Sequence, residues 1–119
     1  MPMVEAMIDA FNRYATFAGR SRRGDFWWFT VFLLLVYALV FLLDTATNTP
    51  VFGAFALLAF VLPSLSLLVR RLHDSDRSAR WLLIAFLPVV GVLALLVMAA
   101  LPGDNDANRY GPPVPKPDW

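Results

Sequence analysis

The side chains best suited to chemistry are concentrated in residues 70–80, a stretch that holds four arginines, one histidine and two aspartates. His73 is followed by Asp74 and Ser75, and an imidazole held by a carboxylate can act as a base toward a hydroxyl group. Adjacent residues on one loop rarely converge in this way, and the sequence supplies no recognisable oxyanion hole. We therefore expect no catalytic residues, and keep an enzyme that uses the His73 and Asp74 loop as the alternative.

Metal and cofactor chemistry has less support in the same stretch. His73, Asp74 and Asp76 lack a second histidine and match no recognised ligand spacing. The chain has no cysteine, which excludes disulfides, thiolate metal sites and cysteine nucleophiles. The expectation is no metal site and no cofactor.

The arginines offer firmer chemistry, because guanidinium groups pair bidentately with phosphates and the cytoplasmic leaflet of a membrane is anionic. In one interpretation they bind lipid headgroups or a partner protein. In the other they fix the orientation of the chain and pair with nearby aspartates. The candidate residues for binding lipid or a partner are Arg20, Arg22, Arg23, Arg70, Arg71, His73, Asp74, Arg77 and Arg80.

Nucleic acid is a poor partner for these charges. The net charge of the chain is only +1, and a basic stretch with interleaved aspartates is a weak footprint for a duplex. We expect no nucleic-acid partner.

Three apolar runs without a charged residue must position these side chains: residues 26–43, 51–69 and 81–101. The chain is 59% hydrophobic, above the roughly 45–50% usual for soluble domains, and the excess is concentrated in these runs. Each run is long enough to cross a bilayer as a helix. The sequence therefore predicts one membrane domain, all-α and polytopic, with three transmembrane helices.

An amphipathic helix is predicted ahead of the first run, over residues 4–18. Apolar residues recur there at helical spacing, with polar residues on the opposite face. Asp9 and Arg13 are four residues apart, in the order that favours an ion pair. The helix lies in the membrane interface in one interpretation, and packs on the cytoplasmic ends of the spans in the other.

The distribution of basic residues predicts the orientation. Residues 44–50, between the first two runs, contain no Lys or Arg, whereas eight of the ten basic residues precede the first run or lie in residues 70–80. The positive-inside rule then places the N-terminus and the 70–80 loop in the cytoplasm. Trp27, Trp28 and Trp81 are expected at headgroup level as interfacial anchors.

The second run carries a stripe of small residues, listed here in order: Gly53, Ala56, Ala59, Pro63 and Ser66. Such stripes let membrane helices approach closely. The run is therefore suited to helix partners, including a second copy of the chain or another membrane protein. None of the three runs contains an ionisable residue of the kind that marks ion and proton paths, so we expect no autonomous transport.

The tail, residues 102–119, is rich in proline and polar residues without a period, and is predicted to be irregular. With three crossings the tail lies outside the cytoplasm. A competing arrangement bends the third run at Pro88 and Gly91 into a re-entrant loop and returns the tail to the cytoplasm. It requires irregular backbone that is shielded by protein.

Three stretches resemble one family, domain of unknown function 805, the YhaH-like small bacterial inner-membrane proteins. They are Phe17-x-Gly19-Arg20-x-x-Arg23-x-Asp25-Phe26-Trp27, Arg70-Arg71-Leu72-His73-Asp74-x-x-Arg77-Ser78 and Pro102-Gly103-x-x-x-x-Asn108-Arg109-Tyr110-Gly111-Pro112. In the third stretch, residues 104–107 replace the Thr, Pro and Gly usual in the family. The resemblance spans most of the chain and implies a bacterial inner-membrane protein, but this family has no established activity.

These features predict a small, non-enzymatic membrane subunit or scaffold whose basic cytoplasmic face binds anionic lipid or a partner protein. Its expected partners are the bilayer, anionic lipid headgroups, and a second copy or another membrane protein. The alternative is a membrane-interface enzyme that uses His73 and Asp74.

Overall fold

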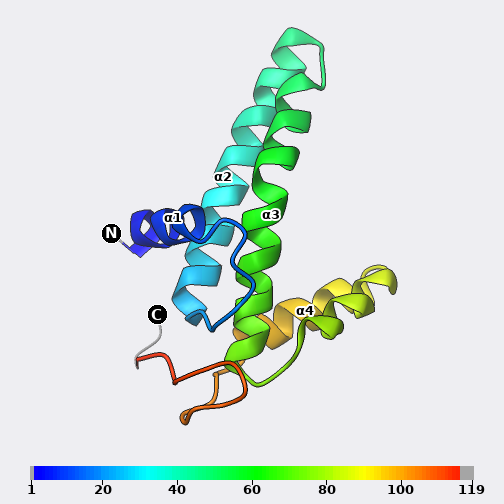
Figure 1. The fold of residues 1–119 in the computed structure, drawn as a ribbon. Coiled ribbons are helices and arrows are strands. Elements are labelled where there is room, and N and C mark those ends of the chain that lie inside the picture. Colours follow the sequence, from blue (N-terminus) through cyan, green and yellow to red (C-terminus); the bar gives the residue numbers. More distant parts are fainter. Residues whose placement is uncertain (1, 116–119) are drawn as a thin grey trace.

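The computed structural model describes residues 2–115, which form helices and no β-strand. Two long helices, α2 (Arg23–Thr47) and α3 (Val51–Asp74), run antiparallel as an upright hairpin (Figure 1). At about 1.5 Å per residue each is roughly 36–38 Å long, which exceeds the roughly 30 Å of a bilayer core. We call the turn at residues 48–50 the tip, and the opposite end, where α2 begins and α3 ends, the base.

The surface of the hairpin is that of a membrane element. Both helices are long and apolar enough to cross a membrane, and only 11% of the most apolar window of α2 and 22% of that of α3 is buried inside the protein. A soluble core helix would be mostly buried. Large side chains such as Leu35, Phe41 and Leu58 are instead 58–71% exposed, and patches of this kind mark contact with a membrane or a partner.

A single carboxylate closes the tip. The two side-chain oxygens of Asp44, near the end of α2, accept the backbone N–H groups of Phe52 and Gly53, each at 2.9 Å. These groups are among the donors that the first turn of a helix leaves unsatisfied. Gly53 suits the contact, because a Cβ there would lie 2.7 Å from the carboxylate. Asn48, with a φ of 55°, ends α2 in the left-handed conformation.

Aromatic rings fill the space between the two helices. Phe29 is 2% exposed and belongs to a buried cluster with Leu67. The ring of Phe32 lies edge-on to that of Phe60, with centroids 5.9 Å apart, a favourable arrangement for aromatic pairs. Apart from Ala56, the buried residues of both helices lie in the half of the hairpin nearer the base.

The small-residue stripe of the second run serves contacts within the chain. Ala56, Pro63 and Ser66 are buried, whereas Ala59 is exposed. The hydroxyl of Ser66 lies within hydrogen-bond distance of the carbonyls of Pro63 (3.1 Å) and Tyr14 (3.2 Å), so the segment after the first helix passes over this end of the stripe. Most of the stripe is thus unavailable to a second copy.

The first helix, α1 (Pro2–Asn12), lies across the hairpin (Figure 1) and is shorter than the predicted 4–18. Its small residues Ala6 and Ala10 are buried, and it packs mainly on α2. Val4 and Ile8 point outward and are 38% and 51% exposed. The helix packs on the side of the hairpin, where Phe11 contacts Phe60 in the middle of α3, and not on its end. A position of this helix in the membrane interface stays a prediction.

Polar contacts hold the end of α1 in place. The predicted ion pair between Asp9 and Arg13 is present, with side-chain hydrogen bonds of 2.9 and 3.0 Å. The Tyr14 hydroxyl donates to the carbonyl of Ala59 on α3 at 2.7 Å. The chain leaves the helix after Asn12 and runs irregularly down to the base, so residues 13–18 are not helical as predicted.

The third apolar run is not the single spanning helix that the sequence predicted. It forms a 3-10 helix, η1 (Ala79–Phe86), followed after a turn by a short α-helix, α4 (Val90–Ala100). At about 2.0 Å per residue for η1 and 1.5 Å for α4, each is roughly 16 Å long. Neither crosses a bilayer core of roughly 30 Å.

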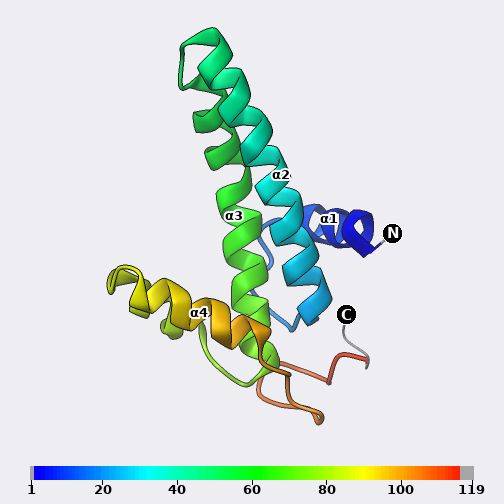
Figure 2. The ribbon, with the colours of Figure 1, turned by 180° about the vertical axis from the view of Figure 1, so that it is seen from behind.

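The bend falls at Pro88 and Gly91, the positions of the competing arrangement. Pro88 has no N–H and disfavours helical backbone in the residue before it, and Val89 has a φ of 66°. Gly91 lets the chain return closely, because a Cβ there would collide with the backbone carbonyl of Ile84. We call residues 79–100 the arm; it projects away from the lower part of α3 in both views (Figures 1 and 2).

Candidate functional site at the base of the hairpin

The 70–80 stretch is only partly the loop that the sequence predicted, because α3 continues to Asp74. Arg70, Arg71 and Asp74 are each 0% exposed, and His73 is 7% exposed. Buried charges are tolerated where they are paired and hydrogen-bonded. This helix end therefore depends on partners from other parts of the chain.

Asp74 lies at the centre of the base, between two guanidinium groups. Its Oδ1 accepts from Nε of Arg20 at 2.8 Å, and its Oδ2 accepts from Nη1 of Arg71 at 2.7 Å. Its backbone carbonyl accepts the N–H of Asp104 at 2.7 Å. One buried carboxylate between two cations leaves a net positive charge, which carbonyl dipoles must stabilise.

Backbone carbonyls of the tail supply part of that stabilisation. Beside its bond to Asp74, Arg20 donates to the carbonyls of Asp104 (2.7 Å), Asp106 (3.1 Å) and Gly111 (3.2 Å) and to that of Asp74 (3.1 Å). All five N–H donors of its guanidinium are thereby used. Because the tail offers main-chain atoms here, the departure from the family pattern at residues 104–107 is compatible with the contact.

Arg71 binds the end of the arm in the same way. Its Nε donates to the carbonyl of Ala99 at 3.1 Å, its Nη2 to that of Leu101 at 2.8 Å and its Nη1 to that of Ser21 at 2.9 Å. The last carbonyls of an α-helix have no partner inside the helix and attract positive charge. The C-terminal end of α4 is therefore fixed to the base by a buried cation.

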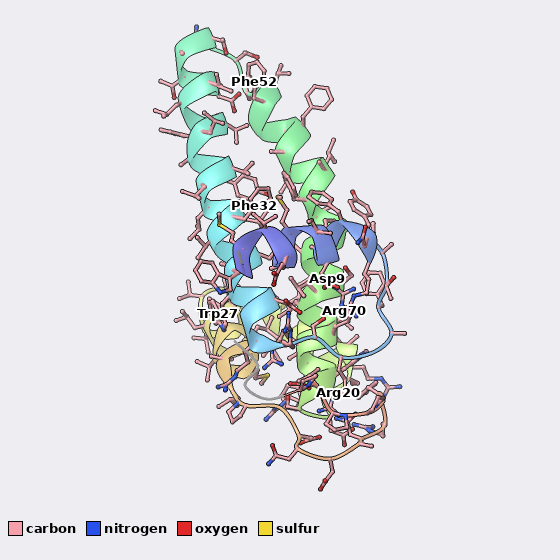
Figure 3. All side chains as sticks on the ribbon, turned by 90° about the vertical axis from the view of Figure 1, so that its left-hand side faces the viewer. Asp9, Arg20, Trp27, Phe32, Phe52 and Arg70 are labelled. Atoms are coloured by element: carbon pink, nitrogen blue, oxygen red, sulfur yellow. The ribbon has the colours of Figure 1, made fainter. Side chains whose placement is uncertain are left out.

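Arg70 holds the segment that follows α1. Its Nε donates to the hydroxyl of Ser21 at 2.8 Å, and its Nη1 to the carbonyls of Arg13 and Thr16 at 3.2 and 3.1 Å. Its Nη2 has no hydrogen-bond partner among the described residues, and lies 3.9 Å from Oδ2 of Asp9. Figure 3 shows Arg70 just below Asp9 and Arg20 nearer the base.

His73 does not pair with Asp74. Its Nδ1 lies 3.0 Å from the carbonyl of Gly19 and must carry the hydrogen, since a carbonyl only accepts. Its ring stacks in parallel on that of Tyr110, with centroids 3.7 Å apart. The described contacts thus give neither a carboxylate-held imidazole nor an exposed base, and the enzyme interpretation gains no geometric support.

The tail is a component of the base, which sequence reasoning missed. A Cβ at Gly103 would collide with the Asp74 carboxylate, so the backbone passes directly over that group. The side-chain amide of Asn108 donates to the carbonyl of His73 at 3.0 Å and to Oδ2 of Asp104 at 2.9 Å. The predicted irregular tail ends with residues 116–119, which lie outside the described part.

An exposed ion pair links the tail to the loop after α3. Nε of Arg109 donates to Oδ1 of Asp76 at 3.1 Å, and its Nη2 donates to the carbonyl of the same residue at 2.8 Å. The side chains are 65% and 41% exposed. The hydrogen bond from Arg109 holds the pKa of Asp76 below its ordinary value of 3.8.

Other arginines face outward. Arg22 pairs with Asp25 at 3.0 Å while its side chain stays 41% exposed, and this hydrogen bond raises the pKa of Arg22. Arg80 is exposed, and its guanidinium has no partner among the residues that the structure describes. Trp28 and Trp81, expected as interfacial anchors, are 39% and 42% exposed.

The structure thus divides the nine candidate residues into two groups. The buried set consists of Arg20, Arg70, Arg71, His73 and Asp74. The exposed set consists of Arg22, Arg23, Arg77 and Arg80, which are partly or fully exposed. All of the buried set meets at the base, together with Ser21 and the tail. The third stretch of the family resemblance was the signal that could have revealed the role of the tail, because it contains Gly103, Asn108 and Tyr110.

This fold and this base define a class: a small helical membrane protein in which an apolar hairpin is closed at one end by buried charges. The family model for "Protein of unknown function (DUF805)" matches residues 14–112, and the chain belongs to this family. The three stretches that carry the resemblance meet at the base, through Arg20, Asp74 and Tyr110.

Two of the curated relatives are inner membrane proteins. Inner membrane protein YhaI of Escherichia coli K12 is 39% identical over 106 residues, which cover 87% of this chain and 90% of the relative. Inner membrane protein YhaH of the same organism is 32% identical over 111 residues, covering 88% and 92%. The uncharacterized protein YiiR is 39% identical over 95 residues, covering 74% of this chain and 60% of YiiR. No solved structure matches the chain significantly.

Proposed function

We propose that this chain is a small, non-enzymatic scaffold or subunit of the bacterial inner membrane whose base binds anionic lipid headgroups. It crosses the membrane twice, with its N-terminus and residues 70–80 in the cytoplasm. Basic residues gather at the base, whereas residues 44–50 at the tip contain none, and this asymmetry supports the orientation.

The exposed set carries the proposal, because it lies where the polar base meets the apolar segments. Arg23 is the first residue of α2 and is followed within a few positions by Trp27 and Trp28. Arg80 directly precedes Trp81 at the start of the arm. Tryptophan rings favour the headgroup level, so these guanidinium groups lie at the depth of lipid phosphates, which they can pair with bidentately.

The buried set has a different role. Arg20 and Arg71 donate to carbonyls and to Asp74 inside the protein, which leaves them unable to reach a lipid. They fix the helix ends from which the exposed set projects. Lipid is favoured over a protein partner because the exposed arginines lie at the ends of different segments. Each can bind a separate phosphate of the surrounding headgroups.

The test is lipid preference in nanodiscs of known composition. A basic residue near an anionic surface contributes about 1 kcal/mol, so Arg77→Gln with Arg80→Gln should lower the preference for phosphatidylglycerol over phosphatidylcholine by up to about 30-fold. Native mass spectrometry of the retained lipid gives the ratio. Arg109→Gln is the matched control, since it removes an exposed arginine that is already paired with Asp76.

Salt supplies an independent criterion, because exposed charges are screened within about 10 Å at 0.1 M ionic strength. The preference of the unaltered protein should fall as salt rises, and that of the double variant should change little. An unchanged preference in the double variant, with Arg109→Gln behaving identically, would refute lipid binding by the exposed set.

A further inference from the structure

Beyond Arg80 at its start, the arm has no charged surface on which it could lie in water or among headgroups. No charged residue occurs from Trp81 to Leu101, and α4 contains only apolar residues and one glycine. Its exposed apolar side chains cover a broad part of the helix surface: Val90 is 69% exposed, Val92 47% and Leu93 57%. A helix that rests in the interface has one polar face and one apolar face. A helix that is apolar on all sides belongs in hydrocarbon or in a core.

The length of the arm sets how far it reaches. Its two helices are each roughly 16 Å long, about half the roughly 30 Å of a bilayer core. Both ends are fixed at the base: η1 starts five residues after α3 ends, and Arg71 binds the carbonyls of Ala99 and Leu101. An element that starts and finishes at one face, with halves this short, stays within one leaflet.

The backbone of the turn is compatible with a lipid environment. Hydrocarbon offers no hydrogen bonds, so the polar groups of the main chain must be satisfied internally. Leu87 donates to Ile84 at 2.9 Å, Val90 to Pro88 at 2.8 Å and Gly91 to Leu87 at 2.8 Å. Pro88 has no N–H, and the N–H of Val89 is the one donor of this turn without a partner among the described residues. The close approach of Gly91 to the backbone of Ile84 thus shields main-chain polar groups of the turn, as a re-entrant element requires.

We propose that the arm is a re-entrant hairpin immersed in the acyl chains of the leaflet at the base, which it enters and leaves on the same side. The apolar surface of the arm thereby continues the lipid-facing surface of α2 and α3. The occupant of its exposed surface is lipid, which contacts Phe86 (83% exposed) and Leu87 (60%) where the arm turns back. The tail returns to the side that holds the loop after α1.

The chain has no cysteine, so single cysteines can report position without background. Ala18→Cys marks the base side and Ala46→Cys marks the tip side; both positions are exposed. Ala107→Cys, exposed in the tail, should react with a membrane-impermeant maleimide from the same side as Ala18→Cys. Reaction from the side of Ala46→Cys would overturn the proposal, because it requires a third crossing.

Depth is the second measurement. A nitroxide at Leu87→Cys should be accessible to oxygen but protected from an aqueous nickel chelate, at a depth within the leaflet of the base. Strong collision with the chelate would place the arm in water and overturn the proposal even if the tail position agrees. Neither result depends on which leaflet faces the cytoplasm or on lipid charge, so a failure here is distinct from a failure of headgroup binding.

Discussion

The two ends of the α2–α3 hairpin are built in different ways. At the tip, one carboxylate, Asp44, caps the next helix over a separation of eight or nine residues. At the base, Arg20 alone contacts groups 54 to 91 residues away. The tip is a local turn, whereas the base assembles the segment after α1, the end of α3, the arm and the tail.

The difference shows where this small membrane protein uses its polar atoms. Two apolar helices gain little hydrophobic driving force from each other in lipid, so a hairpin with only its tip closed would leave the base free to splay. The buried set prevents this, because its charges can be satisfied only when all four segments are in place. Specific structure is concentrated at the base.

The largest effect is expected from Asp74→Ala. The change leaves the guanidinium groups of Arg20 and Arg71 without their shared carboxylate, and removal of one partner from a buried ion pair costs about 3–5 kcal/mol. The free energy of unfolding in mixed micelles with increasing SDS measures the loss. Asp106→Ala removes an equal charge from an exposed tail position, and should stay within about 0.5 kcal/mol of the parent.

A smaller loss is expected from Asp44→Ala at the tip. Removing a helix cap typically costs about 0.5–2 kcal/mol, and Asp44→Asn should recover part of it, because one acceptor oxygen remains. The same SDS titration compares all variants. If Asp44→Ala costs as much as Asp74→Ala, the contrast between the two ends is wrong.

The smallest effect concerns the exposed pair of Asp76 and Arg109, and it depends on pH. Because the pKa of Asp76 in the folded chain lies below the ordinary 3.8, the pairing is fully present above 3.8 and is lost as the pH falls through the lower folded value. Nuclear magnetic resonance of the Asp76 carboxyl carbon follows the titration. Arg109→Gln should move its midpoint upward toward 3.8, and a midpoint above 3.8 in the parent would contradict the ion pair.

Much of the hairpin could be predicted from sequence, because a run of apolar residues without a charge leaves few alternatives to a helix in a membrane. The runs at 26–43 and 51–69 lie inside α2 and α3. The third run misled the prediction, because its length was enough for a crossing. The run is divided by a local feature, a proline without an N–H followed by Val89 at a φ of 66°. The length of an apolar run contains no information about such a feature.

The site could be predicted by residue type but not by role. Arg20 and Arg71 were candidates for lipid binding, yet both are buried. Their acceptors are backbone carbonyls such as those of Asp104, Ala99 and Leu101. Carbonyls are present in every residue, so nothing in the sequence distinguishes those that will meet an arginine. Arg80, by contrast, is exposed and Arg22 is partly exposed, and lipid binding by these two residues stays a prediction.

The dependence of Arg20 on the tail imposes an order on biogenesis. The ribosome makes all the helices before it makes residues 104–111, which carry three of the carbonyls that Arg20 binds. Until that segment emerges, the guanidinium of Arg20 lacks three of its five hydrogen-bond contacts at the junction of α2 and α3. Closure of the base is therefore a late step, because the last segment to be made completes it.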